Sequence, residues 1–402
     1  MSWGEDWVPE PSAPALDLDA LLGHVASGGG SDLHLTVGAP PTVRVRGEMT
    51  PVPGTEVLDG EGLREAIYAV LTEKQRQHLE VSRELDFAYA VPGLARFRVN
   101  VFWQRDQVGA VMRLIPWEIK PLSELGMPAP VASFADLRRG LVLVTGPTGS
   151  GKSTTLAAVI DRINRTRRGH IMTIEDPIEF LHEHRGCLVN QREVGPDTRD
   201  FRTALKHVLR QDPDVILVGE LRDLETISVA LTAAETGHLV LATLHTQSAQ
   251  DTVSRVVDVF PAGQQQQVRT QLAATLQGVV CQSLVPTTDG KGRVVAAEVM
   301  VCTPGVRAMI RDDKLQQIPG ALQSGAKDGM QTINAHLAQH VRQGRISREA
   351  GLEYCSSRED FLSLVGSATT SATTAAASVA PPGSSTGASY PSRPVAAGTS
   401  WS

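Results

Sequence analysis

The sequence has few aromatic residues, few cysteines and no long apolar run. Phe, Trp and Tyr make up only 4% of the 402 residues, so the core must depend on Leu, Val, Ile and Ala. The four cysteines form no C-x-x-C pair, which argues against a zinc site or a disulfide framework and fits reduced thiols in the cytoplasm. No stretch reaches about 18 consecutive apolar residues, and the acidic N-terminus lacks signal-peptide features, so no membrane span is predicted.

Positive charge is not in excess either. The formal net charge is −6, and no aromatic-basic run is present, so no nucleic-acid partner is expected. Apolar residues at 41% and charged residues at 20% are ordinary for a globular protein. The length fits two domains plus tails.

The first half of the chain predicts a small α+β domain over residues 15–117, after a disordered lead-in over residues 1–14. A short helix is expected from Leu16 to about Val25 and a second, single helix over about Gly62–Leu79. Short β-rich segments with Gly or Pro between them predict strands at residues 32–37, 42–47, 85–91, 96–103 and 108–115. Prolines punctuate a connector over residues 118–139.

Residues 140–365 change to a repeated strand–loop–helix pattern. Apolar strands are predicted at residues 141–145, 170–174, 215–218 and 239–244, which indicates a parallel sheet covered on both faces. From about Pro261 the chain is expected to be helical, with Val268, Leu272, Leu276 and Val280 on one face. The tail over residues 366–402 is rich in Ser, Thr, Ala, Pro and Gly and is predicted to be disordered.

A phosphate-binding loop follows the first of these strands. The segment matches G-x-x-x-x-G-K-[ST], with an apolar strand before it and a helix after it. Its backbone N–H groups are expected to converge on phosphate oxygens, Lys152 to reach the β- and γ-phosphates, and Ser153 to bind Mg²⁺. The predicted nucleotide-binding residues are Gly146, Pro147, Thr148, Gly149, Ser150, Gly151, Lys152, Ser153 and Thr154.

Acidic residues and a histidine end the other strands. Glu220 follows an apolar strand at the place of a Walker B carboxylate, one position later than usual because Gly219 ends the run, and is the predicted Mg²⁺ partner. Glu175, Asp176 and Glu179 cluster after the second strand and can supply a base for the attacking water. His245 ends the fourth strand, where it could polarise the γ-phosphate or be structural.

Several long segments resemble one family. Residues 209–223, LRQDPDVILVGELRD, resemble the signature of ATPases of the type II secretion and type IV pilus superfamily. Other segments resemble the pilus retraction (twitching motility) subfamily. They are TIEDPIEF, LVNQREVG, ALTAAETGHLV, TLHT, RVVDVFP, SDLHLTVGAPPTVRVRG and GMQTINAHL. The resemblance covers about residues 16–364. It implies a PAS-like N-terminal domain, a RecA-like P-loop domain with a helical C-terminal part, and a homo-hexamer.

The family also implies roles for individual residues. By resemblance, Glu179 is the catalytic base, Glu220 the Walker B glutamate and His245 a contact to the γ-phosphate or a support for the Walker site. Four arginines of the N-terminal domain are implied to reach the nucleotide, some across a subunit boundary: Arg96, Arg98, Arg105 and Arg113. ATP and Mg²⁺ are the implied cofactors. The implied partner is the inner-membrane platform protein of the pilus, at the cytoplasmic side of the inner membrane, and the sequence leaves open whether a paralogous motor joins the ring.

Three other functions stay open from the sequence. An assembly or secretion motor would use the same chemistry, although relatives of that kind usually carry a longer N-terminal region and a tetracysteine element, which are absent here. A non-hydrolysing regulator is disfavoured by the intact Lys152, Ser153, Glu179, Glu220 and His245. A nucleic-acid translocase finds no support in the charge. Residues 303–312 resemble a retraction-linked helix motif but depart from it at Gly305, Ala308 and Asp312.

Overall fold

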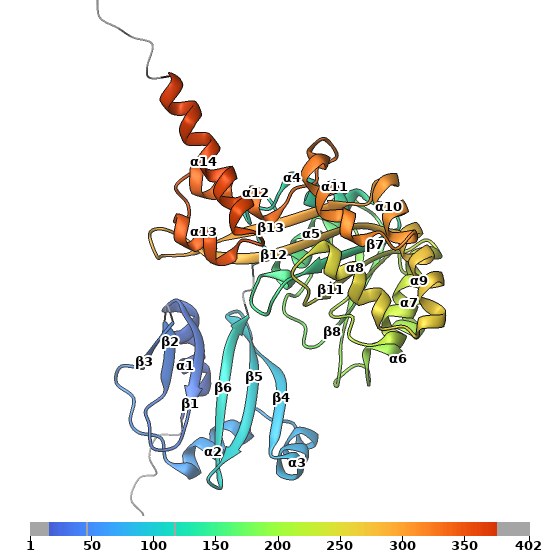
Figure 1. The fold of residues 1–402 in the computed structure, drawn as a ribbon. Coiled ribbons are helices and arrows are strands. Elements are labelled where there is room, and N and C mark those ends of the chain that lie inside the picture. Colours follow the sequence, from blue (N-terminus) through green and yellow to red (C-terminus); the bar gives the residue numbers. More distant parts are fainter. Residues whose placement is uncertain (1–15, 46, 116–117, 376–402) are drawn as a thin grey trace, which may run out of the picture.

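The protein folds as two α/β units, each built on its own sheet (Figure 1). The computed structural model describes residues 16–45, 47–115 and 118–375. The predicted lead-in over residues 1–14 therefore lies outside the described residues. Among the described helices, none is long and apolar enough to cross a bilayer.

The N-terminal domain is a six-stranded antiparallel sheet in the order β3-β2-β1-β6-β5-β4. Its strands are β1 (Gly30–Leu35), β2 (Thr42–Val45), β3 (Glu48–Pro51), β4 (Glu84–Val91), β5 (Ala95–Gln104) and β6 (Gln107–Ile115). Its helices are α1 (Leu18–Ser27), α2 (Gly60–Ala69) and α3 (Glu73–Ser82).

Alternation along the strands gives this sheet one apolar and one polar face. Leu33, Val99 and Met112 are fully buried in a core that also contains leucines of α1, α2 and α3. Their neighbours in sequence point to the opposite face, because successive side chains of a strand alternate. That second face carries Arg98 and Arg113, which are directly opposite one another in the β5–β6 register.

Two expectations for this domain were wrong. The predicted single helix is two helices, because Thr72 begins α3 with a reciprocal capping box in which Gln75 is the partner. The strand β3 was not predicted, since all four of its residues are exposed and it has no apolar alternation.

The ATPase domain has a seven-stranded sheet in the order β13-β12-β7-β11-β10-β8-β9. All neighbours pair in parallel except β13, which is antiparallel to β12. The strands are β7 (Gly140–Thr145), β8 (His170–Glu175), β9 (Leu188–Glu193), β10 (Val215–Val218), β11 (Leu239–Leu244), β12 (Leu276–Pro286) and β13 (Arg293–Val301). The predicted α/β class with a RecA-like domain is confirmed.

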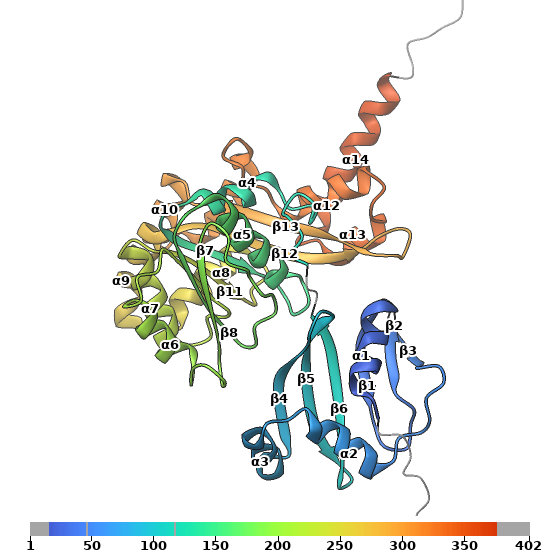
Figure 2. The same cartoon turned by 180° about the vertical axis from the view of Figure 1, so that it is seen from behind.

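Helices cover both faces of this sheet (Figure 2). Leu141 and Leu143 of β7 face one core, with α6 to α11, while Val142 and Val144 face the other, with α5 and the connector. This explains why β7 is buried at every position and apolar from Leu141 to Val144. The helices and turns are α4 (Ala129–Ser133), η1 (Phe134–Asp136), α5 (Lys152–Thr166), α6 (Phe201–Val208), α7 (Leu224–Glu235), α8 (Ala249–Asp258), α9 (Ala262–Thr275), α10 (Pro304–Arg311), η2 (Leu315–Gln317), α11 (Ile318–Ser324), η3 (Gly325–Asp328), α12 (Ile333–Arg342), α13 (Arg348–Tyr354) and α14 (Arg358–Ala375).

The prediction of continuous helix from about Pro261 was wrong between residues 276 and 301. Leu276 and Val280, predicted on one helix face with Val268 and Leu272, lie instead in β12, which pairs with β7 and forms a hairpin with β13. The apolar spacing fits both structures, and pairing with the sheet decided between them. The strand β9 was also not predicted.

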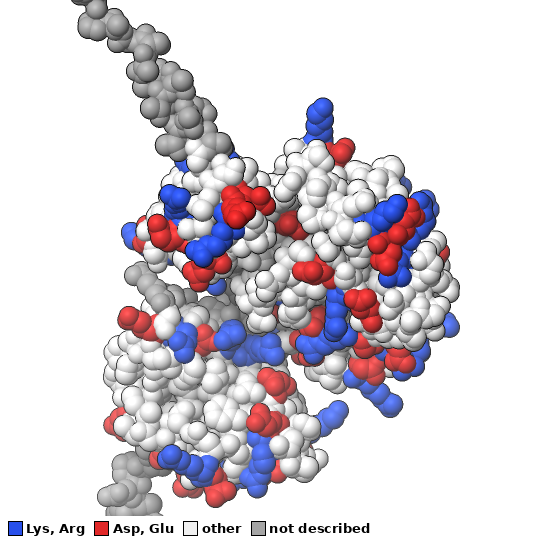
Figure 3. All heavy atoms as spheres, in the orientation of Figure 1, with Lys and Arg blue, Asp and Glu red and all other residues white. Residues whose placement is uncertain are grey.

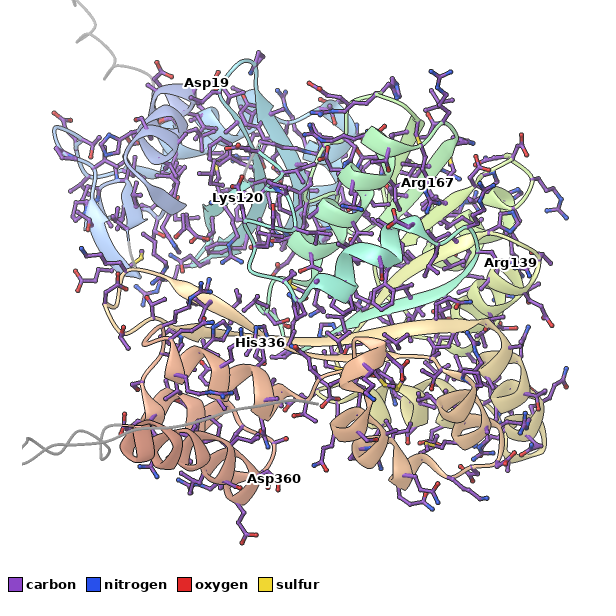
Figure 4. The ribbon with its side chains drawn as sticks, turned by 90° about the horizontal axis from the view of Figure 1, so that it is seen from above. Asp19, Lys120, Arg139, Arg167, His336 and Asp360 are labelled. Atoms are coloured by element: carbon purple, nitrogen blue, oxygen red, sulfur yellow. The ribbon has the colours of Figure 1, made fainter. Side chains whose placement is uncertain are left out.

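The connector and the C-terminal helices attach to this domain through side chains that Figure 4 labels. Arg167, which ends α5, donates hydrogen bonds to the carbonyls of Ala135 and Leu137 in the connector. His336 of α12 accepts a hydrogen bond from the backbone of Ala297 in β13, N to Nδ1 3.0 Å. The helix α14 continues to Ala375, beyond the predicted start of the tail, and residues 376–402 lie outside the described part.

Candidate active site

The phosphate-binding loop joins β7 to α5 at the carboxyl edge of the sheet. Lys152 is the first residue of α5, and Gly151 caps the helix with φ of 88°, a left-handed conformation that strains any residue with a Cβ. The helix N-terminus presents free N–H groups and a positive dipole end toward the loop, which favours an anion there. The motif therefore predicts the position of this site, and the left-handed backbone at Gly151 explains why the motif has glycine there.

Lys152 lies back over the loop. Its Nζ donates to the carbonyl oxygens of Gly146 and Pro147, at 2.9 and 3.0 Å. Burial lowers the pKa of the Lys152 ammonium, and the charges of Glu220 and Glu179 act in the opposite direction. These two carboxylates therefore lie within electrostatic reach of Lys152, which brings the three predicted residues into one site.

The predicted residues come from adjacent strand ends. The order β7-β11-β10-β8 places side by side the phosphate-binding loop, His245 after β11, Glu220 after β10 and Glu175 at the end of β8. Carboxyl ends of parallel strands meet at one edge, which is where open α/β sheets bind ligands. Glu179 follows in the loop after β8 and is exposed.

Glu220 is held by two basic side chains. Its Oε1 lies 3.1 Å from Nε2 of His245, and its Oε2 accepts from Nη2 of Arg222 at 2.8 Å. Burial acts to raise the pKa of Glu220, but the hydrogen bonds from Arg222 and His245 and their charges hold that pKa below its usual value. Glu220 is therefore ionised at neutral pH, as a metal partner must be. His245 contacts Glu220, which fits its predicted role as a support of the Walker site.

The presence of glycine at position 219 has a structural explanation. A Cβ at this position would lie 3.2 Å from the carbonyl oxygen of Ile174 and 3.3 Å from Cα of Glu175. Its N–H donates to Ile174 at 2.7 Å, and its carbonyl accepts from Thr243 Oγ1 at 2.5 Å. The close approach of β8 to β10 makes a side chain here tight, since the backbone of β8 would have to shift by a few tenths of an ångström to admit one.

Glu175 has an unusual environment. It accepts from Thr173 Oγ1 at 2.7 Å and from Gln191 Nε2 at 3.2 Å. Burial raises the pKa of Glu175 to about 7 despite these hydrogen bonds. With Ser153 and His182 it lines a small cavity of about 30 Å³. Gln191, which also donates to the carbonyl of Phe180 at 2.8 Å, links Glu175 to the loop that carries Glu179.

This pKa makes the stability of the protein depend on pH. The carboxyl of Glu175 ionises at about 7 when folded and at 4.5 in a model peptide, so the folded state binds the extra proton and the free energy of unfolding falls as pH rises between these values. Glu175→Gln removes that loss. We therefore compare the free energy of unfolding of the variant with that of wild type by urea denaturation. The difference, variant minus wild type, should increase by about 2 kcal/mol from about pH 5.5 to about pH 8. An advantage that stays constant with pH would contradict this.

The four predicted arginines do not form one cluster. Arg96 binds Glu193 of the ATPase domain, Nη2 to Oε2 3.0 Å, and Arg113 binds Asp32 of β1, Nε to Oδ1 2.7 Å. Arg98 shares the face of β5 with Arg96, as alternation predicted, and is exposed. Arg105 lies in the turn between β5 and β6, about 30 Å along the strand from Arg96 at about 3.3 Å per residue. Figure 3 shows Lys and Arg side chains on both sides of the boundary between the domains.

The sequence analysis missed three residues whose side chains bind the predicted site residues or their loops. Arg222 pairs with Glu220, Gln282 of β12 donates to the Ser150 carbonyl in the phosphate-binding loop at 2.8 Å, and Glu193 accepts from the Ile178 backbone at 3.1 Å. Arg222 and Glu193 lie within the family segments quoted above, so their place in those segments was the available signal. Gln282 lies 132 residues from Ser150 and gave none.

The donor set suits Mg²⁺. Within the described residues, no group of three or more His, Cys, Asp or Glu side chains could hold a metal ion by itself. Mg²⁺ commonly uses one or two protein oxygens and takes the rest from phosphates and water. The Ser153 hydroxyl and the ionised Glu220 are hard oxygen donors of this kind.

The family model described as "Type II/IV secretion system protein" matches residues 94–358. The type IV pilus retraction ATPase PilT of Pseudomonas aeruginosa is 51% identical over 86% of this chain and 100% of its own. A twitching motility protein of Neisseria gonorrhoeae is 48% identical, covering 79% of this chain and 85% of its own. By contrast, type II secretion system protein E of Dickeya dadantii matches only 37% of this chain and 28% of its own.

A solved structure agrees with these relatives. The structure titled as the pilus retraction motor PilT with bound ADP has a TM-score of 0.79 and 46% identity, covering 84% of this chain and 98% of its own. The matched part contains both domains described above. The chain therefore belongs to the type II/IV secretion ATPase family and, within it, to the type IV pilus retraction ATPases, and it is an ATP-hydrolysing enzyme.

Proposed function

We propose that this enzyme works as a homo-hexameric motor that uses MgATP hydrolysis to retract type IV pili, with twitching motility as the result. The observation that carries the proposal is the row of strand ends that brings Glu220, His245 and the Glu179 loop beside the phosphate-binding loop. The near-complete coverage of retraction relatives supports retraction over secretion. The partners are the inner-membrane platform protein and a paralogous motor, which hold the ring at the cytoplasmic side of the membrane.

Each residue has a separate task. The backbone of residues 146–151 and the Lys152 ammonium bind the phosphates of ATP, and the bound Mg²⁺ would neutralise charge on the β- and γ-phosphates. Ser153 would hold that ion directly and Glu220 directly or through water. Glu179 orients the attacking water and takes its proton. His245 and Arg222 keep Glu220 ionised and fixed in place.

The second face of the N-terminal sheet supplies arginines across a subunit boundary. Arg98 is exposed, and the Arg113 side chain is 69% exposed although it binds Asp32. Both therefore remain accessible to a neighbouring subunit. A guanidinium placed beside the transferring phosphoryl group can contribute roughly 10³–10⁵ in rate. Arg105 would contact a different part of the subunit boundary, since it lies beyond the C-terminal end of β5.

Light scattering coupled to size exclusion, combined with an ATPase assay, tests the proposal. We expect the purified full-length chain to form a hexamer with nucleotide and to hydrolyse ATP only with Mg²⁺. A deletion strain should lose twitching and regain it with the wild-type chain. A monomer that turns over at the same rate at every protein concentration would rule out the ring, and normal retraction in the deletion strain would rule out the motor role.

A further inference from the structure

The buried carboxylate of Glu193 holds the loop that carries Glu179. The backbone N–H of Ile178, the residue before Glu179, donates to Glu193 Oε2 at 3.1 Å. Glu175 and Glu193 are directly opposite each other in the parallel register of β8 and β9. The amide that precedes Glu179 is therefore fixed by the end of β9.

The strand β9 braces the same loop at a second point. Gln191, two residues before Glu193 and on the same face of the strand, donates to Glu175 at 3.2 Å and to the carbonyl of Phe180 at 2.8 Å. Its Oε1 accepts from the backbone of His182 at 2.8 Å. The loop from residue 178 to residue 182 is thus bound on both sides of Glu179 by side chains of β9.

Glu193 has a further partner in the other domain. Nη2 of Arg96, at the start of β5, lies 3.0 Å from the Oε2 atom that also accepts from Ile178. The side chains of Arg96 and Glu193 are only 15% and 8% exposed, so water screens this pair weakly. Among the ion pairs of the described residues, it is the one that joins the N-terminal domain to the ATPase domain.

We propose that Glu193 is a positioning residue through which the N-terminal domain controls the placement of Glu179. One carboxylate oxygen binds both the Arg96 guanidinium and the loop amide, so a rotation of the N-terminal domain that withdraws Arg96 changes the position of Glu193 and of the loop with it. The chemical step tolerates little misplacement, since an error of about 1 Å can cost about 10²-fold. Hydrolysis is then fast only while the domain is docked. The proposal rests on Glu179 being the base, as proposed above.

Substitution by Gln separates the two contacts of Glu193. Glu193→Gln removes the charge that binds Arg96 but keeps an amide oxygen for the Ile178 N–H, while Glu193→Ala removes both. Arg96→Gln breaks the ion pair from the other side. The matched control is Arg64→Gln, which breaks the exposed Arg64–Glu80 pair within the N-terminal domain, 2.8 Å. All variants are made in the full chain, and thermal melting shows that each one folds.

We expect Arg96→Gln and Glu193→Gln each to lower kcat about ten- to a hundredfold, with KM for MgATP changed by less than about threefold. The double variant should lose no more than the worse single variant, because both break one interaction. Glu193→Ala should lose more than Glu193→Gln, and Arg64→Gln should match wild type. Spin labels on the two domains should report a broader distance distribution in both single variants.

Several outcomes would overturn the proposal. Losses of kcat that multiply in the double variant, or an unchanged kcat in Glu193→Gln, would show that the pair does not position the loop. A rise in KM confined to Arg96→Gln would make Arg96 a phosphate-binding residue instead. Failure of the proposed function is a separate result, since Glu179→Gln would then turn over normally, whereas failure of this inference alone leaves Glu179→Gln inactive.

Discussion

Lys152→Ala should reduce ATP hydrolysis by about 10³-fold. The Lys152 ammonium is the positive side chain at the N-terminus of α5, and it donates to the loop carbonyls of Gly146 and Pro147. Without it the phosphates lose the positive side chain that the loop itself supplies. Equilibrium binding of a fluorescent ATP analogue, beside the ATPase assay, separates lost binding from lost chemistry.

A second lysine provides the control for charge removal. Lys291 is exposed in the turn between β12 and β13, and Lys291→Ala should hydrolyse ATP like wild type. Ala is a good helix former at the first position of α5, so Lys152→Ala should melt at the wild-type temperature. Hydrolysis at the normal rate by Lys152→Ala would remove the phosphate-binding loop from the site.

Glu179→Gln should bind ATP normally and lose roughly 10²–10⁴ in kcat. The amide has the size of the carboxylate but cannot accept a proton from water. The carboxylate contact that holds the loop next to Glu179 involves the backbone N–H of Ile178, so the substitution leaves it intact. Single-turnover kinetics with saturating nucleotide measure the chemical step apart from binding and product release.

Glu183→Gln is the matched control for this substitution. Glu183 lies in the same connection between β8 and β9, its side chain is 81% exposed, and it makes only a long ion pair with Arg185, 3.7 Å. We expect wild-type turnover from that variant. If Glu179→Gln also turned over normally, the base would lie elsewhere, and Glu175, which the loop places beside Ser153 in the small cavity, would be tested next.

Much of the fold followed from the sequence because the signals were local. The largely apolar strands β7, β8, β10 and β11 were predicted to within a residue or two, since a strand buried on both faces needs apolar side chains at most positions. The predictions of secondary structure failed where contacts with another part of the chain decided between helix and strand. The apolar run after Thr275 fits a helix equally well, and only pairing with β7 makes it a strand.

The site shows the same division. The spacing within residues 146–153 is enough to predict phosphate binding. Glu220 and His245 each follow a strand of the parallel sheet, so the sheet brings them together. The choice of Glu179 over Glu175 as base came from the family resemblance and stays a prediction. In the structure Glu175 is braced by Thr173 and Gln191, whereas Glu179 is exposed, which is compatible with that choice.

The sequence by itself predicted where phosphate binds, and it determined which strand ends carry acids and which family the chain resembles. Only the tertiary structure decided what the N-terminal arginines contact: Arg96 meets Glu193, 97 residues away, while Arg113 meets Asp32 and Arg105 lies at the far end of β5. The physical reason is that spacing within a strand, turn or helix start is fixed by local backbone geometry. A contact between domains depends on how two separately folded surfaces meet, and no local pattern encodes that.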